Sequence, residues 1–167
     1  MAQIKKVHVI DGCESLDRTS VLSLNNAHTK ETSALDEASL TELLDMPFYA
    51  RGIERGATAF LIALDQDASY WSPNFQWFKE FRHRFVYIDR IIVAVSARGQ
   101  GIARVLYEDL FVAAQQAGHN RVVCEVNIEP PNPGSEAFHL TMGFEEVGQA
   151  VIHGGTKTVR YFEKTIC

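Results

Sequence analysis

The sequence has few cysteines and fewer basic than acidic residues, and both features narrow the class of protein to which it can belong. The chain has three cysteines, Cys13, Cys124 and Cys167, and no two of them are closely spaced. An odd number without close spacing indicates neither a disulfide framework nor a zinc site. The six histidines show no close ligand spacing either, so we expect no metal. Sixteen basic against 21 acidic residues give a net charge of -5, which argues against nucleic acid as a partner.

Long apolar stretches are also missing. Residues 1–10 contain an apolar run that is too short for the core of a signal peptide, and no segment approaches the length of a membrane span. With 167 residues, of which 46% are hydrophobic and 22% charged, the chain is long enough for one globular domain with a sizeable core. We therefore predict a single domain over residues 1–167, in a cytoplasmic protein that does not bind membranes.

The most informative stretch is an apolar strand followed by a turn with two glycines. Residues 87–95 are mostly apolar, and Gly99 and Gly101 follow in the turn. Glycine tolerates backbone angles that other residues resist, and it leaves no side chain between the backbone and a ligand. A helix that starts near Gly101 directs its free amide groups and its positive dipole end at whatever lies above the turn. Such an end suits a phosphate or pyrophosphate.

Hydrophobic periodicity and breaker residues predict alternating strands and helices around this turn. The helix after the turn carries an apolar stripe and ends near Gly118, and a strand follows it, which predicts a right-handed crossover unit with parallel strands. Predicted strands cover 7–10, 48–53, 57–64, 85–95, 121–126, 144–152 and 156–164, the last two as an antiparallel hairpin, and predicted helices lie near 16–28, 36–44, 102–117 and 133–141.

Residues 65–84 differ from the rest because they combine many aromatic side chains with turn formers and basic residues. One interpretation is a loop that covers a pocket. The other is a short helix at about 75–81 that packs ordinary core aromatics. Both hold if some rings point inward and others face a substrate.

Two motifs in this sequence resemble those of the GCN5-related N-acetyltransferases, the GNAT superfamily. The turn Arg98-Gly99-Gln100-Gly101-Ile102-Ala103 matches the pyrophosphate pattern Arg/Gln-x-x-Gly-x-Gly/Ala of that family. Residues 132–144 resemble its second signature, Asn-x-x-Ala/Ser followed by an apolar residue, Tyr and Gly-Phe. Asn132, Ser135, Phe138, Gly143 and Phe144 fall in register with it. The resemblance is strongest over residues 85–162.

The resemblance implies an α/β (α+β) fold, with a twisted mixed sheet of about six or seven strands flanked by helices. Strands four and five of that fold part around a cleft for acyl-CoA, and here they correspond to 85–95 and 121–126. It also implies acetyl-CoA as co-substrate, held by main-chain groups along the strand and the turn. The implied cofactor-binding residues are Ile92, Val93, Arg98, Gly99, Gln100, Gly101, Ile102, Ala103, Arg104 and Asn132. Alternatively, Arg98 is a surface charge and Asn132 only caps the next helix.

Acetyl transfer to an amine requires a base for the amine and benefits from an acid for the leaving thiolate. Asp89 stands four residues before Val93, where many relatives carry a Glu that serves as the base. His139 stands where many relatives carry a Tyr that serves as the acid. The alternatives are an Asp89 that pairs with Arg90 or caps the sheet edge, and a purely structural His139. Candidates for the acceptor pocket are Tyr70, Trp71, Asn74 and Tyr87.

The predicted function is therefore acetyl transfer from acetyl-CoA to a primary amine, by direct attack in a ternary complex. A small molecule or amino acid is favoured as the acceptor. The alternative is a GNAT-fold module that binds acyl-CoA without catalysis and acts as a sensor or partner. A dinucleotide-binding domain is disfavoured because Arg104 stands where a third glycine or alanine is needed. The acceptor's identity, the acyl chain length and the oligomeric state, a homodimer included, are left open.

Overall fold

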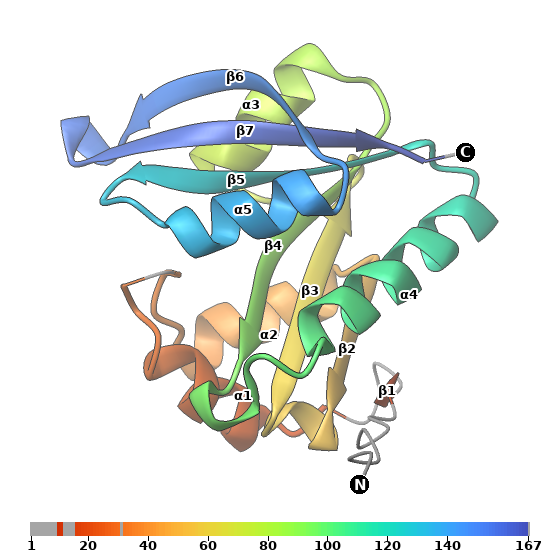
Figure 1. Cartoon of the computed structure of the whole chain (residues 1–167), viewed down its shortest axis with the longest axis vertical. Helices are drawn as coiled ribbons and strands as arrows, with labels where there is room; N and C mark the ends of the chain where they lie inside the picture. The colour runs from red at the N-terminus through yellow and green to blue at the C-terminus, as the bar shows by residue number, and fades with distance from the viewer. Residues whose placement is uncertain (1–9, 12–15, 31, 167) are drawn as a thin grey trace, which may run out of the picture. The chain divides into compact units, whose positions relative to one another are not determined.

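The computed structural model describes residues 10–11, 16–30 and 32–166 (Figure 1). The chain divides into two compact units, unit 1 (Met1–Ile62 and Arg90–Leu110) and unit 2 (Ala63–Asp89 and Phe111–Cys167). The seven strands of the described part pair in the order β1-β2-β3-β4-β5-β7-β6, with both parallel and antiparallel neighbours. This is the mixed sheet flanked by helices that the sequence predicts. No helix among the described residues is long and apolar enough to cross a membrane.

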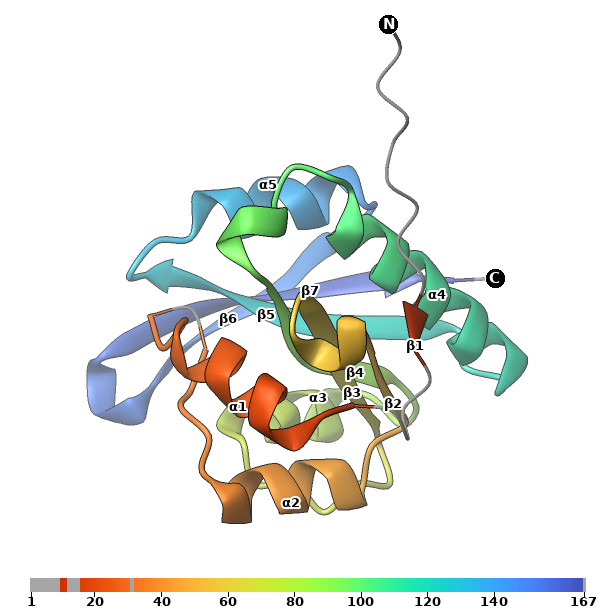
Figure 2. The ribbon, with the colours of Figure 1, turned by 90° about the horizontal axis from the view of Figure 1, so that it is seen from below.

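Unit 1 holds the beginning of the sheet and the turn with two glycines. Its elements are β1 (Ile10–Asp11), α1 (Arg18–Asn26), α2 (Glu37–Asp45), β2 (Tyr49–Ile53), η2 (Glu54–Gly56), the start of β3 (Ala59–Asp65), the end of β4 (Val86–Val93), η3 (Val95–Ala97) and the start of α4 (Ile102–Gln116). Helices α1 and α2 lie on one face of its strands, below them in Figure 2. The predicted strand residues Val7–Val9 lie outside the described residues.

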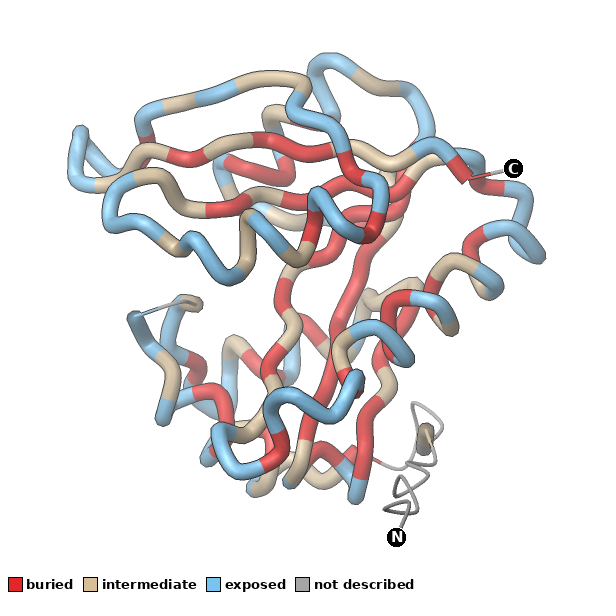
Figure 3. Tube along the Cα trace, viewed as in Figure 1, coloured by how far each residue is buried: buried red, intermediate tan, exposed pale blue. Residues whose placement is uncertain are grey.

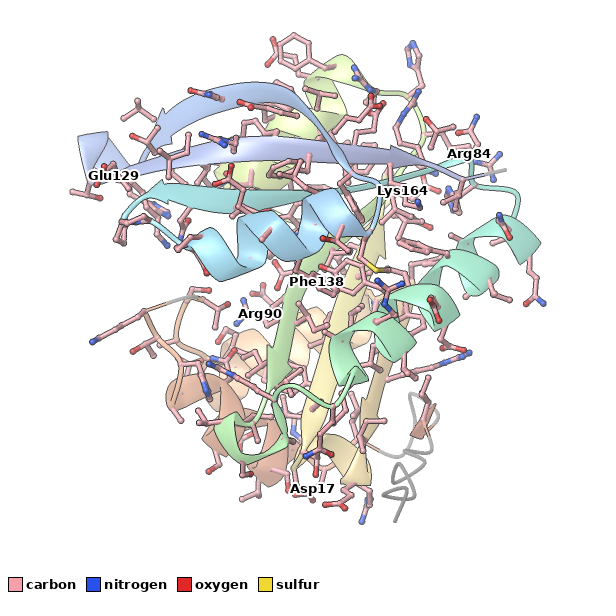
Figure 4. All side chains as sticks on the ribbon, in the orientation of Figure 1. Asp17, Arg84, Arg90, Glu129, Phe138 and Lys164 are labelled. Atoms are coloured by element: carbon pink, nitrogen blue, oxygen red, sulfur yellow. The ribbon has the colours of Figure 1, made fainter. Side chains whose placement is uncertain are left out.

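Polar side chains fix the two helices of unit 1 and the connection between them. Asp17 and Asp36 accept hydrogen bonds from amides in the first turns of α1 and α2 and so act as N-caps. The buried Arg90 of β4 donates from Nη1 to Asn25 Oδ1 at 2.8 Å and to the Ser33 carbonyl at 3.0 Å. Figure 4 shows Arg90 extending from β4. These bonds tie the connection after α1 to the sheet.

Unit 2 holds the end of the sheet. Its elements are the end of β3, α3 (Pro73–Phe81), the start of β4, the end of α4, β5 (Arg121–Glu129), α5 (Pro133–Thr141), β6 (Glu145–Ile152), η4 (His153–Gly155) and β7 (Lys157–Thr165). Strand β7 pairs antiparallel with both β5 and β6, so it lies between them. Helices α3 and α5 lie on opposite faces of these strands (Figures 1 and 2).

The core of the sheet follows the predicted apolar runs. In β3, the side chains of Ala59 to Leu64 are fully buried, which agrees with a strand that is covered on both faces (Figure 3). Within unit 2, the parallel pairing of β4 with β5 comprises Val86–Val122 and Tyr87–Val123, at the start of both strands.

Several strand boundaries differ from the sequence prediction, and for the ends of β4 and β5 the structure shows the cause. Strand β4 ends at Val93 rather than residue 95, because the chain then enters the 3₁₀ turn η3, where the Ala97 amide bonds the Ala94 carbonyl at 2.9 Å. Strand β5 continues past residue 126 to Glu129, because its pairing with β7 reaches Thr158. The predicted bounds of α5 are confirmed, as is the antiparallel β6–β7 hairpin.

Candidate active site

The turn with two glycines lies in unit 1 and has an open backbone. Gly99 and Gly101 have φ angles of 76° and 78°, which glycine adopts without strain. A Cβ placed on either residue would meet nothing within 4 Å. Helix α4 starts at Ile102, and amides in the first turn of a helix have no acceptor within it. The turn therefore leaves room for an anion beside the positive end of a helix.

The other predicted residues of this segment lie at the end of β4 and at the start of α4. Arg98 is exposed, and its Nε donates to the Val93 carbonyl at 3.3 Å, so its side chain folds back on the strand that leads into the turn. Ile92 is buried, whereas Val93 is only partly buried. Arg104 Nη1 lies 3.7 Å from Glu108 Oε1, one turn further along α4. A guanidinium on each side adds positive charge to the turn.

Unit 2 contains a hydrogen-bonded group of acidic and aromatic side chains, which we name the carboxylate cluster. Its members are Tyr70, Asn74, Tyr87, Asp89, Glu125 and Tyr161. The Tyr87 hydroxyl donates to Glu125 Oε2 at 2.8 Å, and the Tyr70 hydroxyl donates to Asp89 Oδ1 at 2.5 Å. Each carboxylate thus has a tyrosine donor of its own.

Glu125 is the most perturbed carboxyl group of the cluster. Burial is the main cause and raises its pKa from the ordinary value of 4.5 to about 8, and the negative charge of Asp89 acts in the same direction. The hydrogen bonds from Tyr87 and Asn74 oppose this rise without cancelling it. Glu125 therefore exchanges its proton close to neutral pH, as a general base must.

Two tyrosines of the cluster, Tyr87 and Tyr161, keep their protons. Burial, reinforced by the charge of Glu125, raises the pKa of Tyr87 well above its ordinary value and that of Tyr161 to about 12. Tyr161 donates its hydroxyl hydrogen to Asn74 Oδ1 at 2.9 Å, which orients the amide of Asn74 toward Glu125. Both tyrosines are thus fixed hydrogen-bond donors.

Helix α3 supports the cluster with aromatic packing. The ring of Phe75 lies 5.7 Å from that of Tyr70 and 5.5 Å from that of Tyr87, measured between centroids, and Phe78 lies 5.2 Å from Tyr161. Trp71, between Tyr70 and the helix, is 88% exposed. The interpretation as a helix that packs core aromatics is therefore confirmed, with the helix beginning at Pro73, whereas a loop that covers a pocket stays a prediction.

Helix α5 carries the remaining predicted residues. Asn132 is its N-cap, and Asn132 Oδ1 accepts from the Ser135 amide at 3.3 Å. His139 is 4% exposed, and its Nδ1 lies 2.7 Å from the Ser135 carbonyl. Burial lowers the pKa of His139, although the bond to Ser135 partly opposes this. A neutral histidine with Nδ1–H donating to that carbonyl fits this geometry, and the rings of Phe144 and Phe162 pack on it.

The structure thus places the sequence-predicted residues in separate groups. It brings Tyr70, Asn74, Tyr87 and Asp89 together in unit 2, whereas Trp71, the next residue after Tyr70, is exposed. The residue that sequence reasoning missed is Glu125. Its signal was an acidic side chain within the apolar run Val122-Val123-Cys124-Glu125-Val126 of a predicted strand. Among the described residues, no group of three histidine, cysteine or acidic side chains could hold a metal ion.

Comparison with known proteins identifies the class to which this fold and turn belong. The profile of the acetyltransferase (GNAT) family matches residues 29–144. The chain belongs to that family and is an acetyltransferase that depends on acetyl-CoA, the co-substrate of the family. The open glycine turn fits the pyrophosphate of this co-substrate. A comparison with curated protein sequences finds no match.

Solved structures share the fold over nearly the whole chain. The N-acetyltransferase from Staphylococcus aureus Mu50 is 18% identical with a TM-score of 0.68, and the match covers 96% of this chain and 99% of that one. The ribosomal-protein-alanine N-acetyltransferase from Brucella melitensis is 21% identical with a TM-score of 0.70, and the match covers 95% of this chain and 99% of that one. A chain of the NatC complex bound to Gag peptide and CoA is 16% identical with a TM-score of 0.69, and the match covers 95% of this chain and 98% of that one. At this identity the likeness concerns the fold alone.

Proposed function

We propose that this acetyltransferase acts on a primary amine by direct attack, and that Glu125 accepts the proton which the amine must lose. Acetyl-CoA supplies the acetyl group as a thioester. The observation that carries the proposal is the partly buried Glu125 carboxyl, which accepts a hydrogen bond from Tyr87 and has a pKa of about 8. General bases are most effective when their pKa lies near the working pH.

Asp89 acts with Glu125 rather than in place of it. Its negative charge raises the pKa of Glu125 and attracts the ammonium form of an acceptor. The bond from Tyr70 holds the carboxylate in one orientation. The predicted role of Asp89 as the base is thus extended to a pair of carboxylates, of which Glu125 takes the proton.

The turn with two glycines supports acetyl-CoA binding in unit 1. We assign the pyrophosphate to the amides of residues 98–104, because the glycine backbones are open and α4 begins there. By family resemblance, the main chain of Ile92 and Val93 pairs with the pantetheine arm, and Asn132 contacts the arm or the loop around it. Strand β4 carries Tyr87 and Asp89 and leads directly into Val93 and the turn.

His139 has a structural role in this proposal. A histidine whose pKa is lowered by burial is mostly neutral at pH 7, so little imidazolium exists to protonate a thiolate. Its ring instead fills a space lined by phenylalanine rings and closes a turn of α5 through Ser135. Water then supplies the proton of the leaving thiolate.

The acceptor class follows from proton matching. The N-terminal α-amino group of a peptide has a pKa of about 7.7–8.0 and a lysine side chain about 10.4, so proton transfer to a base with a pKa of about 8 is nearly balanced only for the N-terminal α-amine. The proton match therefore favours such an α-amine, and a small molecule or amino acid stays the acceptor that the sequence predicts. The exposed Trp71 offers such a molecule an aromatic face. The cytoplasmic location and a homodimer stay predictions.

A thiol-release assay with acetyl-CoA and a panel of amines tests the proposal. The panel contains free amino acids, short peptides with free N-termini and alkyl amines. We expect turnover that is fastest with an α-amine and that falls at least a hundredfold in Glu125→Gln, on the order of the contribution of a general base. Glu129→Gln is the matched control, because Glu129 is exposed on the same strand.

Three results would contradict parts of the proposal. Equal turnover in wild type and Glu125→Gln removes Glu125 from the mechanism. A preference for lysine-like amines contradicts the acceptor class. Binding of acetyl-CoA without turnover of any amine supports the alternative, a non-catalytic module that senses acyl-CoA.

A further inference from the structure

We propose a second anion site in unit 2, which binds a phosphate group attached to an aromatic or other apolar moiety. The site is a hollow of about 580 Å³ on the surface of unit 2. Its walls are Phe81, Arg82, His83, Arg84, Gly118, Asn120 and Arg121. They come from the end of α3, the connection to β4, the connection after α4 and the first residue of β5. The volume falls in the range of small-molecule sites.

The hollow has more positive charge than its own carboxylate can neutralise. Arg82 Nε lies 2.7 Å from Glu163 Oε2, and Arg121 Nε lies 3.0 Å from the same oxygen. Arg84 forms no ion pair within the described part of the chain, and its Nη2 donates only to the Ala117 carbonyl, at 3.2 Å. One carboxylate thus pairs with two of the three guanidinium groups, which leaves a net positive charge among these four side chains of the concave surface.

The arginines are held in place but retain free donors. The side chains of Arg82 and Arg121 are 27% and 29% exposed, so each is partly packed. Arg121 Nη1 donates to the Arg84 carbonyl at 3.4 Å, which connects two walls of the hollow. A guanidinium has more N–H donors than these bonds use, and its planar fork matches the oxygens of a phosphate.

Two acidic side chains, Asp65 and Asp67, lie close enough to act on His119, as Arg84 does. Neither forms an ion pair with the three arginines among the described residues, so they offset the positive charge only from a distance. Figure 4 shows Arg84 near the end of unit 2 where β5 begins. The glycine turn follows the opposite end of β4, so the two anion sites use different segments of the chain.

Phe81 gives the hollow an apolar surface, which suits the apolar moiety of the proposed ligand. Its side chain is 53% exposed although it lines the hollow, and its ring lies 4.7 Å from that of Trp77, which holds it in position. An apolar surface beside arginine donors fits a molecule with both a ring and a phosphate. Phenyl phosphate is the simplest probe with this chemistry, and inorganic phosphate lacks the ring.

Calorimetric titration with both probes tests the inference, in an Arg98→Glu background so that the glycine turn does not contribute. We expect phenyl phosphate to bind this background more tightly than inorganic phosphate does. Adding Arg84→Gln should raise the Kd of both phenyl phosphate and inorganic phosphate about tenfold, since hydrogen bonds to charged groups contribute on this scale. Arg84→Lys should lose less, because it keeps the charge without the fork. Lys79→Gln is the matched control, because Lys79 is exposed on α3 outside the hollow.

The remaining substitution separates the two parts of the ligand. Phe81→Ser should weaken phenyl phosphate and leave inorganic phosphate unchanged. Equal binding by the Arg84→Gln and Lys79→Gln proteins would overturn the site. The absence of binding by either probe at millimolar concentration would also overturn the site, and would favour an acidic protein partner as the ligand of the arginines. Thermal unfolding of each variant excludes misfolding as the cause of a loss.

Discussion

Replacement of Glu125 by Gln offers the sharpest test of the carboxylate cluster, because it changes stability and activity in related ways. In the unfolded chain the carboxyl ionises at about 4.5, whereas in the folded protein the pKa is about 8. The folded state therefore binds more protons than the unfolded state between these two values. Stability from this group is fully present below pH 4.5 and is lost as the pH rises through 8.

The size of the effect follows from the same two values. Between pH 4.5 and 8, each pH unit lowers the free energy of unfolding by about 1.4 kcal/mol, which amounts to about 5 kcal/mol over the whole interval. Gln cannot ionise, so Glu125→Gln lacks this dependence while all other groups are shared with the wild type. The difference in free energy of unfolding, wild type minus variant, should fall by about 1.4 kcal/mol per pH unit between pH 5 and 8 and then level off.

Urea unfolding of both proteins at one-unit intervals from pH 5 to 9 measures this difference. Glu129→Gln should give a difference that is nearly independent of pH, because its carboxylate is exposed. A constant difference for Glu125→Gln would refute the reasoning, since it would mean that Glu125 ionises in the folded protein as it does in the unfolded chain. With acetyl-CoA and an amine, kcat/KM of the wild type should rise with pH up to about 8.

The other predictions concern the remaining site residues. Asp89→Asn should lower the pKa of Glu125, because it removes a negative charge, so the acid limb of the pH profile of kcat/KM should move to lower pH. An acid limb that does not move would mean that Asp89 has no influence on the ionisation of Glu125. Arg98→Glu should abolish most of the stabilisation by acetyl-CoA, which at one hundred times Kd is about 2.7 kcal/mol, or a rise in Tm of roughly 5–10 °C; an equal rise in both proteins would contradict the pyrophosphate assignment. His139→Phe should retain activity within a few fold and lose about 1 kcal/mol with the bond to Ser135. A hundredfold loss of kcat at unchanged stability would instead establish His139 as the acid.

Much of the candidate site could be read from the sequence because it depends on short segments. The turn at 98–103 needs glycines for its positive φ angles, and the helix after it starts where the apolar stripe begins. Asn132 and Pro133 fix the start of α5, so its bounds were predicted correctly. The positions of Asp89 and Tyr87 on one strand were equally visible, whereas the partner of each was not.

The cluster and the hollow depend on contacts between distant segments. Glu125 meets Tyr87 across 38 residues of chain, and Asn74 meets Tyr161 across 87. Only the packing of α3, β4, β5 and β7 in unit 2 removes water from the Glu125 carboxyl, and this desolvation raises its pKa. The three arginines likewise gather at one hollow only because the connection from α3 to β4 meets the start of β5 there. The sequence by itself determined the family, the elements and the anion-binding turn, since these follow from local backbone preferences. The tertiary structure decided which carboxyl can serve as a base, because burial is a property of the assembled fold.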